Sequence, residues 1–259
     1  MQASTFAMMY TFKKSLGQHF LKDENISRKI VAALTEHPFK NLLEIGPGAG
    51  ALTRFLLQLD AIEFKAIELD DEKVNYLLHT YPSLEGKLIQ SDFLKAEIPF
   101  DSSFIIVGNF PYNISSQILF KILGWRQQVP LVVGMFQKEV AQRIASKPNS
   151  KVYGILSVLV QAFYDVKYLF DVSPSSFNPP PKVMSGVIEL TKRTMHPPMK
   201  AEKDFFLVVK TAFNQRRKKL RNAVRNLFSD DILQDGIFDN RAEQLSVDDF
   251  AALTFKMKA

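Results

Sequence analysis

The sequence predicts an α/β protein whose mostly parallel sheet is followed by a small domain made only of helices. Short apolar runs at 41–45, 64–67 and 104–107 alternate with longer amphipathic stretches, which is the order of a parallel sheet with crossover helices. A glycine-rich turn follows the first run directly. The strand pattern ends near residue 193, and only helical spacing follows. We therefore predict a first domain over residues 1–193 and a second over residues 194–259.

Composition narrows the class of protein. The 259-residue chain has a formal charge of +6 and a pI near 9.3, which favours a polyanionic partner. It contains no Cys, which excludes disulfides and thiolate sites, and its four His show no metal-ligand spacing, so we expect no metal. No stretch has the apolar length of a membrane span, and no leader pattern is visible at the N-terminus. We expect a cytoplasmic protein without membrane contact.

The segment Lys13–Leu21 combines two Lys with a Gly and three large apolar residues. It is either a basic arm docked through its apolar side chains or a segment that closes over a bound cofactor. A helix then follows, with Ile26, Ile30 and Leu34 on one face and Asp23 or Asn25 as its N-cap.

The first strand, Asn41–Ile45, runs straight into Gly46-Pro47-Gly48-Ala49-Gly50, and a helix is predicted from about Ala51. Strand, glycine loop and helix form the nucleotide-binding arrangement, because glycines permit a tight turn and let a ligand approach the backbone.

Acidic residues end the next two strands. Glu68 follows Phe64–Ile67 and is placed to accept both hydroxyls of a ribose, whereas Asp70 is predicted to cap the next helix. Asp92 follows the third strand, where it either accepts from the amino group of an adenine, with Phe93 beside the ring, or simply stabilises a turn.

The fourth strand, Phe104–Val107, leads into Gly108-Asn109-Phe110-Pro111-Tyr112. The Asn109 carbonyl can accept from an amine, Pro111 fixes the neighbouring backbone, and Tyr112 offers a flat face for a base. Such a set suits an exocyclic nucleobase amine, which attacks an electrophilic methyl group more readily once its N–H groups are held by acceptors. The alternative is an ordinary turn with a half-buried Tyr.

Three further strands are predicted at 131–136, 163–170 and 186–190. A proline-rich loop joins the last two and contains Phe177 and Lys182. It either presents Phe177 to a substrate ring, with Lys182 near phosphate, or is a connector with Phe177 tucked inside.

The linker 192–198 leads to helical residues with an apolar stripe through Phe213, Leu220 and Phe228. The stripe is accompanied by six cations without an acid among them, namely Arg216, Arg217, Lys218, Lys219, Arg221 and Arg225. Such a run is either a solvated surface or, as we favour, a site for a phosphate backbone.

The order of these motifs favours S-adenosylmethionine over a dinucleotide, because a nicotinamide enzyme does not need Asn109 and Tyr112 after its fourth strand. In these motifs the chain resembles the small-subunit ribosomal RNA adenine dimethyltransferases. The resemblance rests on seven segments, namely 15–21, 43–50, 67–70, Asp92, 108–116, 177–183 and 213–222. His19 stands where many members have Asn.

The resemblance implies a Rossmann-like class I S-adenosylmethionine-dependent methyltransferase sheet with a small all-helical C-terminal domain that binds RNA. It also implies the reaction: two adjacent adenosines in the 3′-terminal hairpin loop of small-subunit RNA, within an immature 30S particle, are each methylated twice at N6. The expected cofactor contacts are His19, Leu21, Gly46, Gly48, Glu68, Asp92 and Asn109. Asn109 and the Pro111 carbonyl would accept from the target amine, and Tyr112 and Phe177 would hold its ring. We expect a monomer.

Two alternatives stay open at this stage. One is the related macrolide-resistance methyltransferase, which modifies large-subunit RNA. The other is an assembly factor that binds RNA without catalysis, although intact Glu68 and Asn109–Tyr112 motifs disfavour it.

Overall fold

The computed structural model describes residues 19–258, and by packing the chain forms two compact units. The first comprises residues 1–138 and 168–191, and the second comprises residues 139–167 and 192–259. Our sequence-based prediction for the segment before His19 lies outside the described residues. The boundary between functional domains after residue 193 stays a prediction. The compact units divide the chain differently, because residues 139–167 pack with the C-terminal helices.

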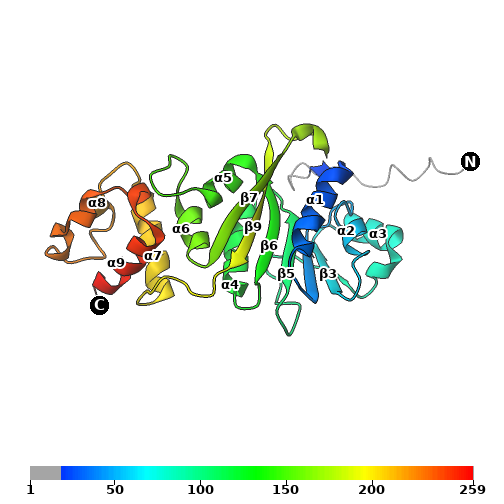
Figure 1. Cartoon of the computed structure of the whole chain (residues 1–259), viewed down its shortest axis with the longest axis horizontal. Helices are drawn as coiled ribbons and strands as arrows, with labels where there is room; N and C mark the ends of the chain where they lie inside the picture. The colour runs from blue at the N-terminus through cyan, green and yellow to red at the C-terminus, as the bar shows by residue number, and fades with distance from the viewer. Residues whose placement is uncertain (1–18, 259) are drawn as a thin grey trace, which may run out of the picture. The chain divides into compact units, whose positions relative to one another are not determined.

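A seven-stranded sheet dominates the first unit (Figure 1) and has the order β4-β3-β2-β5-β6-β9-β7. Its strands are β2 (Asn41–Ile45), β3 (Glu63–Glu68), β4 (Leu88–Gln90), β5 (Ile105–Asn109), β6 (Leu131–Gln137), β7 (Tyr164–Val172) and β9 (Ser185–Lys192). The pairs from β4 through β6 are parallel, and β9 runs antiparallel to β6. The strands predicted from apolar runs are therefore confirmed.

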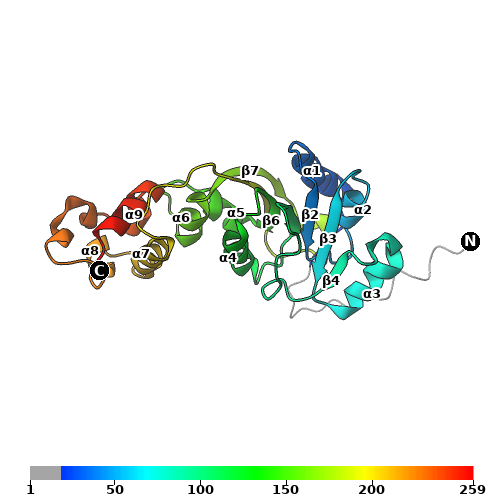
Figure 2. The ribbon, with the colours of Figure 1, turned by 90° about the horizontal axis from the view of Figure 1, so that it is seen from below.

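Helices on both faces bury this sheet. They are α1 (Glu24–Thr35), α2 (Thr53–Leu56), α3 (Asp71–Thr80) and α4 (Ser115–Trp125). Figures 1 and 2 show α1 and α2 on one face and α4 on the other. Strands covered on both faces are buried along their length, which fits the apolar run of β6 and the full burial of β2, although β2 also contains the polar residues Asn41 and Glu44.

The predicted caps of α1 and α3 are present. The carboxylates of Asp23 and Asp70 accept from the backbone N–H of Asn25 and Glu72, over 3.0 and 3.1 Å. The helix predicted after the glycine loop is shorter than expected. Regular α-helix covers only Thr53–Leu56, with turns on either side.

A second, two-stranded sheet joins distant parts of the chain. In it, β1 (Phe20–Leu21) pairs antiparallel with β8 (Phe177–Asn178), with Leu21 opposite Phe177. The sequence contains no sign of this pairing, because each strand has only two residues. It brings the N-terminal segment and the proline-rich loop together.

After β9, the described residues of the second unit form only helices, turns and irregular connections. Its helices are α5 (Lys138–Ala145, which starts at the end of the first unit), α6 (Ile155–Gln161), α7 (Glu202–Asn214), α8 (Leu220–Ala223) and α9 (Val247–Leu253). Short 3-10 turns connect α8 and α9. Leu220, Val224 and Phe228 of the predicted apolar stripe are fully buried, although the stripe crosses a break between α7 and α8 rather than one long helix.

Candidate active site

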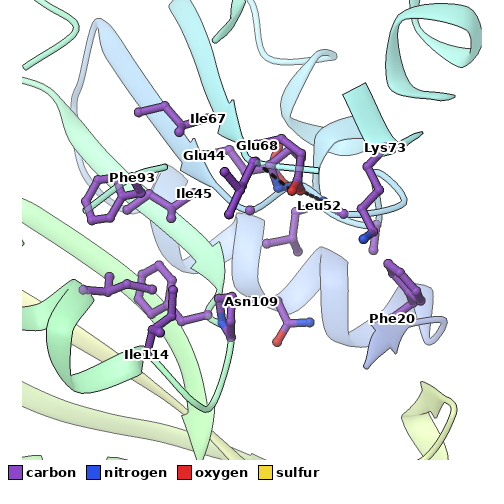
Figure 3. Close-up of a pocket in the computed structure, with 18 of the residues that line it drawn as sticks. Phe20, Glu44, Ile45, Leu52, Ile67, Glu68, Lys73, Phe93, Asn109 and Ile114 are labelled. Carbon is purple, nitrogen blue, oxygen red and sulfur yellow. Dashed lines mark hydrogen bonds between the residues drawn. The ribbon is translucent and has the colours of Figure 1, made fainter. Parts of the chain in front are cut away.

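A pocket of about 260 Å³ lies at the carboxyl ends of β2, β3 and β5, within the first unit. This is the position at which open α/β sheets bind ligands. Figure 3 shows Asn109 and Ile114 across the pocket from Glu44 and Glu68, with Phe93 at one end and Phe20 and Lys73 at the other. The pocket is lined by all of the predicted cofactor residues, namely His19, Leu21, Gly46, Gly48, Glu68, Asp92 and Asn109.

The glycine loop takes a backbone conformation that requires glycine. Gly46 and Gly48 have φ angles of +66° and +58°, in the left-handed region that side chains with a Cβ disfavour. The Gly46 N–H donates to the Ile67 carbonyl over 2.9 Å, which joins the loop to the end of β3. A Cβ at position 48 would lie 3.3 Å from the Phe20 ring, so Phe20 packs closely over the loop.

The Glu68 carboxylate organises the floor of the pocket. One of its oxygens accepts from the Gly48 N–H over 3.1 Å, and the other accepts from Leu69 and Asp70 at 2.9 and 3.0 Å. Donors of this kind hold the carboxylate in one orientation. Of the roughly four lone-pair sites of a carboxylate, three are used, so the oxygen that accepts from Gly48 can still accept from a ribose hydroxyl.

Glu44 is a pocket residue that our sequence reasoning missed. It lies within β2, and its carboxylate accepts from the Thr53 hydroxyl over 2.8 Å. Burial, with a contribution from the charge of Glu68, raises the pKa of Glu44 to about 8. The available signal was an acid in an otherwise apolar strand immediately before the glycine loop.

Lys73, in the first turn of α3, was also not predicted. Its ammonium group is buried at 3.2 Å from the Asp70 carboxylate and 5.4 Å from the centroid of the Phe20 ring. It therefore joins α3 to the N-terminal segment beside the pocket.

Asp92 stabilises a turn and lines the pocket, and its contact with an adenine amino group stays a prediction. One carboxylate oxygen accepts from the Leu94 N–H over 2.9 Å, which is a turn contact, yet the residue also lines the pocket. The neighbouring Phe93 is buried and packs edge-on against Trp125, with ring centroids 5.2 Å apart.

Asn109 is the last residue of β5. Its amide nitrogen Nδ2 donates to the backbone carbonyl of His19 over 3.2 Å. This bond orients the amide, so that the oxygen Oδ1 is the group left to accept from a ligand.

The loop after Asn109 is anchored by a buried ring. Phe110 is 1% exposed and contacts Phe136 edge-on at 5.0 Å between centroids. It lies over Gly108 and Gly134, which face each other across β5 and β6. A Cβ at either glycine would come within 2.6 or 2.4 Å of this ring. The Pro111 carbonyl accepts from the Ile114 N–H over 3.2 Å and keeps a second lone pair.

Tyr112 is held on two sides. Its hydroxyl shares a hydrogen bond of 2.5 Å with the hydroxyl of Ser185, the first residue of β9. Its ring stacks on that of His19, with centroids 5.7 Å apart and planes at 30°. Burial raises the pKa of the Tyr112 hydroxyl, so this group stays protonated at neutral pH.

The sequence leaves two alternatives for Phe177, a substrate contact or a ring tucked inside the connector. Phe177 is 1% exposed and packs in the hydrophobic core as part of β8, and it is not among the residues that line the pocket. Leu21 of β1 lies opposite Phe177 in the two-stranded sheet, and the contact of Phe177 with a substrate ring stays a prediction.

The basic run begins after α7, continues through α8 and ends just beyond it, in the second unit. Acids from later in the chain pair with three of its cations. Asp239 lies 2.7 Å from Lys219 and 2.8 Å from Arg221, and Glu243 lies 3.7 Å from Arg216. Arg217 and Lys218 are exposed, and neither forms an ion pair within residues 19–258. Arg225 is likewise exposed without an ion pair in the described residues, and these three cations are the strongest candidates in this run for binding phosphate.

In the described part of the chain, no cluster of His, Asp or Glu has the arrangement of a metal site. Across the same residues, no helix has the length and apolar character needed to cross a bilayer.

Solved structures define the class of this fold. A dimethyladenosine transferase from Plasmodium falciparum superposes with a TM-score of 0.74 and 26% identity, over 90% of this chain and 94% of that one. The 23S rRNA methyltransferase ErmE gives a TM-score of 0.70 with 21% identity, over 92% of this chain and 99% of that one. The protein has the Rossmann-like fold of class I S-adenosylmethionine-dependent methyltransferases, as predicted.

Sequence comparison assigns the family. The model of the ribosomal RNA adenine dimethylase family matches residues 9–257, so the chain belongs to this family. The protein named ribosomal RNA small subunit methyltransferase A in Flavobacterium johnsoniae is 54% identical over 251 residues, 95% of this chain and 96% of that relative. The protein of the same name in Cytophaga hutchinsonii is 53% identical over 247 residues, 93% and 95% of the two chains. The resemblance seen in the sequence is therefore confirmed.

Proposed function

We propose that this enzyme uses S-adenosylmethionine to dimethylate N6 of two adjacent adenosines in the 3′-terminal hairpin loop of small-subunit (16S) ribosomal RNA. It would act as a monomer on an immature 30S particle in the cytoplasm. The names of the relatives at 54% and 53% identity support the small subunit as the target. The observation that carries the proposal is the orientation of Asn109, whose amide oxygen is left as an acceptor beside Tyr112 and the glycine loop.

The residues present fit S-adenosylmethionine. At Gly46 and Gly48 the loop exposes backbone that carries no Cβ atom, so a ligand can lie against it. Glu68 would accept from the ribose hydroxyls and Asp92 from the adenine amine, with Ile67 and Phe93 beside the ring. His19, Leu21, Gly46 and Gly48 would close the pocket around the remainder. When bound, S-adenosylmethionine supplies a methyl carbon made electrophilic by the attached sulfonium.

Asn109 and Tyr112 would position the target base. The oxygen Oδ1 of Asn109 and the Pro111 carbonyl accept from the two amine N–H groups, which favours a pyramidal nitrogen with its lone pair toward the methyl group. Tyr112 stacks on the base. Holding two reactants in line can lower a barrier by about 7–11 kcal/mol. Methylation leaves an acidic cation whose proton passes to water, so no residue has to act as a strong base.

Loop adenosines suit this site because extruding an unpaired base loses little pairing and stacking. In the second unit, Arg217 and Lys218 would bind the phosphate backbone of the same RNA.

The test is methyl transfer from labelled S-adenosylmethionine to immature 30S particles, with 50S subunits and naked RNA in parallel. Label in two neighbouring adenosines of the small-subunit RNA is the expected result. Label confined to large-subunit RNA would instead assign the protein to the resistance methyltransferases. Tight binding to 30S particles without transfer to any RNA would indicate an assembly factor.

A further inference from the structure

One residue contacts both functional ends of the loop Asn109–Tyr112. The backbone carbonyl of His19 accepts from Nδ2 of Asn109 over 3.2 Å, and its ring stacks on the Tyr112 ring at 5.7 Å. Asn109 and Tyr112 are the residues whose relative placement decides where a target amine lies. We infer that His19 is a positioning residue, and that its side chain sets the orientation of Tyr112 while its backbone sets that of Asn109. This inference rests on the proposed function.

The His19 ring is itself fixed by the fold. Its Nδ1 lies 2.9 Å from the carbonyl of Pro179, and because a proline carbonyl can only accept, Nδ1 carries the hydrogen. His19 directly precedes β1 and Pro179 directly follows β8, so the β1–β8 pairing, with Phe20 opposite Asn178, places donor and acceptor together. The ring therefore has a support that does not depend on Tyr112.

Tyr112 is held at its opposite end by Ser185. The hydroxyl–hydroxyl contact of 2.5 Å fixes the tip of the ring, while the His19 ring covers part of one face. A ring fixed at its tip can still rotate about its long axis, and a neighbour stacked on its face resists that rotation. Substrate adenine would consequently stack on the face of Tyr112 that His19 leaves open.

This arrangement predicts that a substitution of His19 affects turnover and cofactor affinity differently. A substitution leaves the backbone carbonyl in place, so Asn109 keeps its partner and the pocket keeps its glycine loop and Glu68. The side-chain interactions lost are the stacking on Tyr112 and the hydrogen bond to the Pro179 carbonyl. The expected deficit is therefore in turnover rather than in cofactor affinity.

The test compares three substitutions. His19→Ala removes both the ring and Nδ1, His19→Phe keeps a planar ring without the hydrogen bond, and His19→Asn keeps a polar donor without the ring. Lys22→Ala, an exposed side chain of the same segment, is the matched control. The measurements are kcat and KM for methyl transfer to 30S particles, the Kd for S-adenosylmethionine by calorimetry, and thermal unfolding.

We expect His19→Ala to lower kcat by roughly 10- to 100-fold, since small misplacements in an active site cost this much. Its Kd for S-adenosylmethionine should change less than about threefold, and His19→Phe should recover more of kcat than His19→Asn if ring stacking is the support. In a Tyr112→Ala background, adding His19→Ala should lower kcat further by less than about threefold, because the two residues act together.

Unchanged kcat in a folded His19→Ala enzyme would overturn the inference, as would a loss of S-adenosylmethionine affinity as large as the loss of kcat. Full additivity with Tyr112→Ala would also overturn it. A wild-type protein that transfers no methyl group to any RNA would instead overturn the proposed function, so the two failures are distinguishable.

Discussion

The backbone N–H of Gly48 donates to the Glu68 carboxylate over 3.1 Å, which ties the glycine loop to the end of β3. Two neighbouring N–H groups, of Leu69 and Asp70, hold the same carboxylate. The proposed ribose acceptor is thus also a structural support for the loop beside it.

Glu68→Gln is expected to weaken S-adenosylmethionine binding by at least about tenfold and to destabilise the protein by about 1–3 kcal/mol, since an uncharged amide with one acceptor oxygen cannot satisfy all three donors. Calorimetric titration and denaturant unfolding measure the two effects. Full affinity together with unchanged stability would contradict this role of the carboxylate.

Gly134→Ala should displace Phe110 and thereby disturb the loop Asn109–Tyr112. The added Cβ would come within 2.4 Å of Phe110 and 2.8 Å of Phe136, both of which are buried rings. Overpacking of this kind costs about 1–3 kcal/mol, and relief requires Phe110 to shift together with Asn109 and Pro111. We expect lower stability by denaturant unfolding and a kcat reduced by at least about tenfold.

Gly124→Ala is the matched control for this substitution. It lies in α4 with nothing within 4 Å of an added Cβ, so it should leave kcat unchanged. A helical Gly replaced by Ala typically gains about 0.5–1 kcal/mol of stability. Equal behaviour of the two variants would contradict the proposed contact with Phe110.

Asn109→Ala tests the acceptor role directly. Methyl transfer should fall by at least about 100-fold, because the amine loses one of its oriented acceptors, while RNA affinity changes less than about threefold. Single-turnover transfer and filter binding to 30S particles measure the two quantities. An equal loss of binding and transfer would remove Asn109 from this role.

Stability should depend on pH through Glu44. Its pKa is raised from 4.5 to about 8 on folding, so between these values the folded state binds more protons than the unfolded state. The free energy of unfolding should therefore decrease as the pH rises from 4.5 to about 8, and this contribution should then level off. Glu44→Gln, which stays neutral and can still accept from Thr53, should remove this slope in urea titrations at several pH values.

The cations of the basic run should contribute unequally to RNA affinity. Arg217→Ala and Lys218→Ala should each weaken RNA binding and reduce the slope of log K against log salt by about 1, as expected for one lost phosphate contact. Lys219→Ala should have a smaller effect, because Asp239 lies 2.7 Å from its ammonium group. The hydrogen bond from Lys219 holds the pKa of Asp239 below its usual value, so the partner stays charged near neutral pH.

Asp239→Asn provides the converse measurement. It frees Lys219 and Arg221 from their acidic partner, so RNA affinity at low salt should increase. Equal effects of Ala at positions 217, 218 and 219, with no response to Asp239→Asn, would contradict this division of the run.

The sequence by itself determined the strands, the glycine loop, and the acids and the Asn109–Tyr112 motif at the strand ends. These features follow from local rules: an apolar run of strand length, residues that tolerate positive φ, and the common edge at which parallel strands end. The same residues carried the resemblance that the family comparison confirmed.

Tertiary structure decided what depends on residues far apart in the chain. Phe177 is buried because β8 pairs with β1, more than 150 positions earlier, and no local pattern specifies a partner for a two-residue strand. Asp239 neutralises cations that look unopposed in the sequence, and His19 reaches Asn109 and Tyr112 only through the folded N-terminal segment. Burial likewise shifts the pKa of Glu44, a change that residue type alone cannot indicate.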